Sequence, residues 1–306
     1  MPSNYSRLPD CIISSPMQPK HFSLPLLALL LAACGSGGVS TPALDLNTPV
    51  VSTATPLAYV ANVNGEGITA DSFNTNVRMF QDAQSQTGTL LATQEARQTV
   101  LDSLVDRLLL AQAARAAGFV ADDALLDERL ASITEQAGGA DAFAGWLATF
   151  GLTPTGYREE LRLELEAAHM VAALSAAVPA TAEQVLARQV LLPDQFSAER
   201  VLGQLESGTP FETVVVNNDP RRLGTLGWFP RGYLLQGEVE DAAFALQPGQ
   251  YSQVIETEIG FHLIEVLAHE ADRPLSPQAL QVLQTQAIQA WLEQQRAGSA
   301  IEILLP

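Results

Sequence analysis

The sequence predicts an α+β protein with a helical part followed by a part of short strands and turns. Three observations lead to this class. The chain has 306 residues, of which 47% are hydrophobic, which is enough for one large or two ordinary domains. Residues 93–177 show the apolar periodicity of helices, and after residue 181 the pattern changes to short apolar runs separated by Gly and Pro.

The N-terminus has the build of a secretory signal. Lys20 precedes the apolar run 26–33, which is far shorter than the roughly 20 residues that a membrane-spanning helix needs. Leu31-Ala32-Ala33-Cys34 resembles the lipobox of bacterial lipoproteins, which implies cleavage before Cys34 and acylation of its thiol. The alternative is an ordinary signal with a cysteine there by chance. We predict a lipoprotein signal peptide at residues 1–34.

Residues 35–57 are rich in Gly, Ser, Thr and Pro and lack helical periodicity, which predicts a flexible tether. Cys11 precedes the predicted cleavage point and Cys34 would carry lipid, and the sequence has no other cysteine. We therefore expect no disulfide in the mature chain.

The next segment, residues 58–180, is expected to be a helical domain. A short strand at 57–63 precedes the turn Asn64-Gly65, and Thr69 suits a helix N-cap. Leu101, Leu104 and Leu108 lie on one helical stripe. We expect helices at residues 69–84, 93–117, 122–136, 140–149 and 154–177.

A second domain is expected at residues 181–270. Thr181-Ala182-Glu183-Gln184 predicts a capping box at its start, and residues 211–216 predict a helix or an extended turn before a Gly/Pro-rich loop. The remaining elements are strands at 187–192, 253–256 and 260–267 and helices at 197–207 and 238–245. Residues 271–306 are expected to form a helix from Ser276 and a strand at 300–305 that pack back on the helical domain.

Charge and residue pattern exclude several functions. A formal charge of −18 argues against binding nucleic acid through a basic face. The sequence has no Gly-x-Ser-x-Gly elbow and no phosphate-binding glycine loop, and its four histidines show no metal-ligand spacing. We therefore expect no metal and no nucleic-acid partner. Residue patterns alone support only an exported two-domain protein.

Four segments in order resemble the parvulin (rotamase) family of prolyl isomerases. They are Leu186-Ala187-Arg188-Gln189-Val190-Leu191-Leu192, Leu226-Gly227-Trp228-Phe229-Pro230-Arg231-Gly232, Ala242-Ala243-Phe244-Ala245-Leu246-Gln247-Pro248-Gly249 and Gly260-Phe261-His262-Leu263-Ile264-Glu265-Val266. Residues 58–177 resemble, more weakly, the helical chaperone domain of SurA- and PrsA-type foldases. The resemblance implies a small antiparallel sheet flanked by helices and cis/trans isomerisation of X–Pro bonds, which needs no cofactor.

The resemblance also implies site residues. Leu226, Phe229, Leu234 and Val239 match the apolar wall that holds the proline ring, and Phe229 is expected to face the ligand while Trp228 packs. His262, Thr257 and Asp219 match positions of the family's catalytic pocket. Gln189 stands where the family has the first of two histidines. Because glutamine has both a donor and an acceptor, it can partner His262 without titrating.

Three functions follow from these features. The first is a lipid-anchored isomerase and foldase on the extracytoplasmic face of the cell membrane, whose partners are unfolded or partly folded exported proteins containing proline and the bilayer bound by acylated Cys34. The second, favoured by Gln189, is a holdase chaperone with a degenerate parvulin domain. The third is an adaptor in a cell-envelope assembly that binds through its helical domain.

Overall fold

The computed structural model describes residues 58–88, 91–218 and 224–304. Within them the chain forms two compact units, Ala173–Ala290 (the sheet unit) and residues 58–172 with 291–304 (the helical unit). The predicted signal peptide, Cys34 and the predicted tether lie outside the described residues. No helix in the described part of the chain is both long enough and apolar enough to cross a bilayer.

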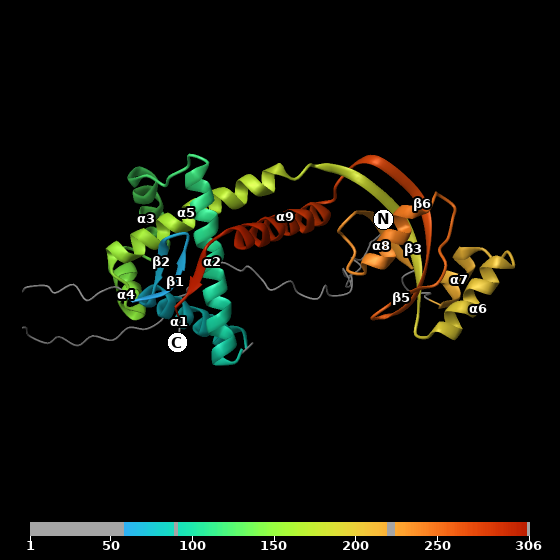
Figure 1. The fold of residues 1–306 in the computed structure, drawn as a ribbon, viewed down its shortest axis with the longest axis horizontal. Coiled ribbons are helices and arrows are strands. Elements are labelled where there is room, and N and C mark those ends of the chain that lie inside the picture. The colour runs from blue at the N-terminus through green and yellow to red at the C-terminus, as the bar shows by residue number, and fades with distance from the viewer. Residues whose placement is uncertain (1–57, 89–90, 219–223, 305–306) are drawn as a thin grey trace, which may run out of the picture. The chain divides into compact units, whose positions relative to one another are not determined.

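The helical unit combines helices with a small three-stranded sheet. Strand β1 (Tyr59–Val63) pairs antiparallel with β2 (Glu66–Thr69) and with β7 (Ile301–Ile303), so the last described strand lies beside the first (Figure 1). The helices are α1 (Ala70–Thr87), α2 (Thr93–Ala116), α3 (Asp123–Gln136), α4 (Ala140–Phe150) and α5 (Pro154–Ala177), of which α5 continues into the sheet unit.

Sequence patterns account for the packing of the helical unit. Thr69 caps α1, since its side chain accepts a hydrogen bond from the backbone nitrogen of Ser72. The predicted stripe of α2, with Leu101, Leu104 and Leu108, is buried against the sheet and α1. These helices were predicted within a few residues of their ends. Strand β2 was not predicted, because its four residues gain their hydrogen bonds only from β1.

The sheet unit contains a four-stranded antiparallel sheet in the order β4-β3-β6-β5. Its strands are β3 (Thr181–Leu192), β4 (Thr225–Pro230), β5 (Ile255–Thr257) and β6 (Gly260–Pro274). Its helices are α6 (Gln195–Glu206), α7 (Phe211–Asn218), α8 (Gly237–Ala245) and the first part of α9 (Pro277–Gly298), which ends in the helical unit. The predicted α+β class, with helices flanking an antiparallel sheet, is confirmed.

Two local predictions in this unit are wrong. Residues 181–184 do not cap a helix but begin β3, because they pair with the C-terminal part of β6 and the Gln184 side chain donates hydrogen bonds to the carbonyl oxygens of Arg273 and Pro274. Residues 226–230, expected within a loop, form the edge strand β4 against β3.

Helices cover both faces of the four-stranded sheet (Figure 1). On one face, Val190 and Leu263 pack against α6 and α7. On the other, Ile264 and Val266 pack against Phe229 and α8. Because side chains alternate along a strand, odd-numbered residues of β3 near residue 189 share the α8 face with even-numbered residues of β6.

Candidate active site

Three hydrogen-bonded side chains, Gln189, His262 and Thr257, form a row on the α8 face of the sheet, here called the polar row. His262 is 1% exposed, and its Nδ1 lies 2.9 Å from Gln189 Oε1. Its Nε2 lies 2.9 Å from the hydroxyl of Thr257. Gln189 Oε1 can only accept, so Nδ1 of His262 donates the proton of that hydrogen bond. The Thr257 hydroxyl also donates to the Gly260 carbonyl oxygen at 3.1 Å, which ties the row to the β5–β6 hairpin.

Burial favours the neutral form of the His262 imidazole. Desolvation lowers the pKa of His262, and the negative charge of Glu238 on α8 opposes the shift in part. At neutral pH the imidazole is uncharged and serves as a fixed hydrogen-bonding group. Isomerisation of a prolyl bond moves no proton between reactants, so a neutral, oriented ring is compatible with that reaction.

Two glycines allow the backbone to bring these residues together. Gly260, with φ of 135°, lies so close to β3 that a Cβ atom would come within 2.6 Å of the Leu192 carbonyl oxygen. Gly224, with φ of 59°, lies beside Gln189, whose backbone nitrogen donates to the Gly224 carbonyl oxygen at 2.8 Å. A Cβ atom at Gly224 would stand 2.0 Å from the Gln189 carbonyl oxygen. Both positions therefore require glycine.

The four residues matched to the proline-holding wall lie in one apolar cluster beside this row. Phe229 is 0% exposed and meets Phe244 edge to face, and Val239 is also buried. Leu226 and Leu234 are only half-buried at the edge of the cluster. Phe229 thus supports the cluster from inside instead of facing solvent, while Trp228 is half-buried beneath the guanidinium of Arg273.

Strand pairing connects the polar row to the apolar cluster. Gln189 lies opposite Ile264, a member of the cluster, in the β3–β6 pair. His262 lies opposite Ile255, which packs against the same cluster, in the β5–β6 pair. Opposed residues on one sheet face have Cβ atoms about 5 Å apart. The arrangement offers hydrogen-bonding groups next to apolar side chains on one face.

Glu240 was not singled out from the sequence, yet it fixes one side of this region. Its buried carboxylate accepts hydrogen bonds from the backbone nitrogens of Gly232 (2.6 Å), Tyr233 (2.9 Å) and Leu234 (3.0 Å). The loop that carries Leu234 is therefore held against α8. Glu240 lies in the first turn of α8, where an acidic side chain is usually solvated. Its role therefore becomes visible only once the three loop amides are placed in the structure.

Asp219, the remaining matched site residue, lies outside the described residues. Within the described part of the chain, no group of three or more His, Cys, Asp or Glu side chains could hold a metal ion.

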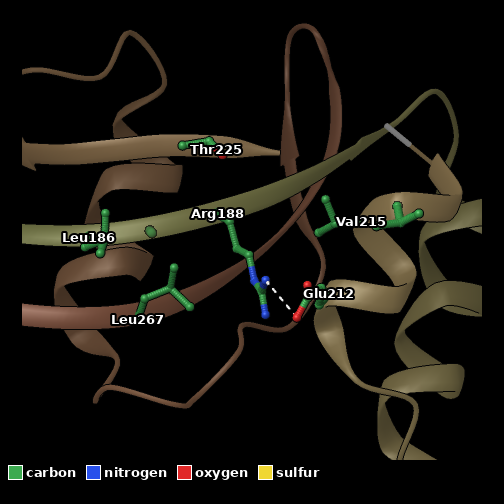
Figure 2. Close-up of a pocket in the computed structure, with 8 residues that line it drawn as sticks. Leu186, Arg188, Glu212, Val215, Thr225 and Leu267 are labelled. Carbon is green, nitrogen blue, oxygen red and sulfur yellow. Dashed lines mark ion pairs between the residues drawn. The ribbon is translucent and has the colours of Figure 1, made fainter. Parts of the chain in front are cut away.

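A cavity of about 190 Å³ lies on the opposite face of the sheet, away from His262. Figure 2 shows Arg188 reaching from β3 toward Glu212 on α7, with Leu186, Leu267 and Val215 around it. The guanidinium of Arg188 lies 2.6 Å from Glu265 and 4.0 Å from Glu212. None of the matched site residues lines this cavity.

Comparison with known proteins divides the chain into two family segments. Residues 172–268 match the model of the PPIC-type PPIase domain. Residues 24–171 match the model of the SurA-like N-terminal domain. The match to the SurA-like N-terminal domain covers α1 to α4 and most of α5, and the match to the PPIC-type PPIase domain covers the polar row and the apolar cluster.

Individual relatives agree with this division. The chain is 29% identical to the foldase protein PrsA of Geobacillus sp. strain WCH70 over 127 residues, which are 40% of this chain and 45% of that protein. It is 26% identical to the chaperone SurA of Alcanivorax borkumensis over 251 residues, which are 68% of this chain and 56% of SurA. It is 55% identical over 47 residues to the peptidyl-prolyl cis-trans isomerase ssp-1 of Neurospora crassa, or 15% of this chain and 25% of that enzyme. The chain thus matches about half the length of the first two relatives.

Proposed function

Because the chain belongs to the parvulin-type foldases that join a SurA-like N-terminal domain to a PPIC-type PPIase domain, we propose that it catalyses cis/trans isomerisation of X–Pro peptide bonds in exported proteins. The observation that carries the proposal is the row of Gln189, His262 and Thr257 beside an apolar cluster with Leu226 and Leu234 at its edge. Unfolded or partly folded chains containing proline are its substrates.

The reaction requires little from the protein beyond binding a twisted amide. The barrier of about 18–20 kcal/mol reflects the amide resonance that is lost during rotation. Apolar side chains hold the proline ring, and fixed donors and acceptors stabilise the rotated amide in a site from which water is excluded. Each tenfold gain in rate needs only about 1.4 kcal/mol of selective binding to the transition state. No cofactor takes part.

The test is isomerisation of a proline-containing peptide by the purified full chain, followed by exchange NMR. Uncatalysed exchange takes about 10–100 s at 25 °C, and we expect the chain to shorten it at substoichiometric concentration. Leu234→Ser should lower kcat/KM by roughly tenfold, because it removes apolar area at the edge of the cluster. Exchange at the uncatalysed rate, with circular dichroism showing a folded chain, would refute the isomerase.

Gln189 supports a second candidate, a holdase that binds clients without catalysis. This function predicts that the chain suppresses aggregation of a denatured client but leaves its proline-limited refolding phase unchanged. It also predicts that Gln189→His restores turnover by completing the histidine pair of the family. If wild type already accelerates the slow phase, the holdase alternative is excluded.

We also propose that the protein is a lipoprotein on the extracytoplasmic face of the membrane, with signal peptide 1–34, tether 35–57, helical domain 58–180, parvulin domain 181–270 and C-terminal segment 271–306. The proposal is supported by the lipobox-like sequence that ends at Cys34. Metabolic labelling with a palmitate analogue in a bacterial host should mark the wild-type chain and not Cys34→Ser. Equal labelling of the two would rule out acylation of Cys34.

A further inference from the structure

We infer that Leu191 and Ile259 form a contact for the side chain that precedes proline in the client, and that this contact selects large apolar residues. The inference rests on the proposed isomerase function. Both side chains are large, apolar and exposed, and both residues neighbour the polar row: Leu191 lies opposite His262, and the backbone nitrogen of Ile259 donates to the Thr257 hydroxyl.

Leu191 is placed by strand pairing. In the β3–β6 pair it lies directly opposite His262, so the two side chains share the α8 face of the sheet. Leu191 is 45% exposed and lies in the last part of β3, beyond the residues 184–188 that pair with β4. A Cβ atom on Gly260 would lie 3.1 Å from Cδ1 of Leu191, so this side chain covers the backbone of the β5–β6 hairpin at Gly260.

Ile259 lies in the β5–β6 hairpin, next to Gly260, and a hydrogen bond fixes its backbone. It precedes Gly260 in the hairpin, and its backbone nitrogen donates to the Thr257 hydroxyl at 3.3 Å. This is the hydroxyl that lies 2.9 Å from His262 Nε2, so Ile259 is attached directly to the polar row. Its side chain is 56% exposed. Leu191 and Ile259 therefore flank the outer end of the row with apolar surface that a ligand can cover.

Two observations indicate which part of a client covers Leu191 and Ile259: the two residues lie next to the proposed proline site, and the nearby charges are negative. A proline held at the half-buried edge of the cluster brings its preceding residue next to the polar row, where Leu191 and Ile259 are exposed. Glu258 is exposed in the same hairpin, and the negative charge of Glu238 reaches His262. A large apolar side chain buries area against the two residues, whereas an acidic side chain is repelled by these carboxylates.

The test is a series of peptides Ala-X-Pro-Phe with X as Leu, Phe, Ala or Glu, assayed with the full chain. We expect kcat/KM to be roughly tenfold higher for Leu or Phe than for Glu, since apolar pocket contacts of this size discriminate by about 10–200-fold. Leu191→Thr should reduce the Leu/Glu ratio mainly through KM, and Ile259→Lys should invert it by attracting the glutamate. Leu267→Thr is the matched control, because Leu267 is 43% exposed on the opposite face and should leave the ratio unchanged.

The possible failures are distinguishable. If wild type isomerises all four peptides with similar kcat/KM, or if Leu191→Thr and Ile259→Lys keep the wild-type ratio, the specificity contact is wrong and the isomerase stands. If folded wild type isomerises none of the peptides, the isomerase itself is refuted and the contact with it. Thermal unfolding of each variant confirms that a lost preference does not reflect a lost fold.

Discussion

The carboxylate of Glu240 accepts a hydrogen bond from the backbone nitrogen of Leu234, 3.0 Å away, and thereby ties a loop of the candidate site to helix α8. Two further amides of the same loop share this carboxylate. The position of Leu234 consequently depends on a residue that need not touch the substrate.

Replacing Glu240 by glutamine should loosen this loop. The amide keeps one acceptor oxygen but directs an NH2 group toward backbone donors, so we expect a loss of about 2–3 kcal/mol in the free energy of unfolding. KM for prolyl peptides should rise more than kcat falls, because the apolar edge loses its position. Urea denaturation and peptide kinetics measure the two effects. Asp241→Asn, an exposed neighbour on α8, should change neither, and equal behaviour of the two variants would contradict the role of Glu240.

The neutral His262 predicts a pH dependence of stability. Its folded-state pKa is lowered by burial, so below the ordinary value of 6.5 the unfolded chain binds a proton that the folded chain does not. Stability is therefore complete above pH 6.5 and decreases as pH falls toward the folded-state pKa. Chemical denaturation between pH 5 and 8 measures this decrease, and His262→Gln should remove the part due to His262.

Gln189→Glu should reverse the sign of this dependence. A carboxylate 2.9 Å from Nδ1 favours the imidazolium and raises the pKa of His262. If it rises above 6.5, this histidine makes the folded chain more stable as pH falls through that value. NMR titration of His262 in the two proteins provides the measurement. An unchanged pKa would show that Gln189 does not contact the ring.

Gly224→Ala should disturb the site more than Gly227→Ala. Both glycines have positive φ, of 59° and 77°, so both substitutions carry backbone strain of about 1–2 kcal/mol. Only at Gly224 would the new methyl group meet the Gln189 carbonyl oxygen; nothing lies within 4 Å at Gly227. We expect Gly224→Ala to cost about 1–3 kcal/mol more and to shift the NMR signals of His262. Similar thermal stability of the two variants would contradict this prediction.

Arg296→Met should destabilise the helical unit. The guanidinium of Arg296 in α9 donates to buried Asp106 in α2 at 2.5 Å, and burial raises the pKa of Asp106. Removing one partner of such a pair typically costs about 3–5 kcal/mol, because the other charge stays buried. The double variant Arg296→Met with Asp106→Asn should recover part of the loss in thermal unfolding. An additive double variant would show that the two residues do not interact.

The sequence predicted elements whose signals are local. Helix α2 carries its apolar stripe and α1 its N-cap in consecutive residues, so both were found. Strands β2 and β4 were missed because each is short and depends on a partner strand elsewhere in the chain. The same reason explains residues 181–184, where polar side chains typical of a cap instead bind the distant end of β6.

In the candidate site, too, local motifs identified some residues, whereas features that depend on tertiary packing were missed. Motif positions identified His262, Thr257 and Gln189, and their hydrogen bonds are now defined. Their roles in catalysis remain predictions. The buried state of Phe229 and the loop contacts of Glu240 depend on how α8 packs against the sheet, which no local pattern encodes.

The pairing of β7 with β1 has a consequence for the order in which the protein can fold during synthesis. The partner of Ala61 in this ladder is Ile303, which the ribosome adds only after every residue of the sheet unit has been made. One edge of β1 can pair early with β2, but its other edge must wait for β7, whereas every residue of the sheet unit, 173–290, is made before β7. We expect a nascent chain that ends near residue 290 to protect its C-terminal half from protease before its N-terminal half.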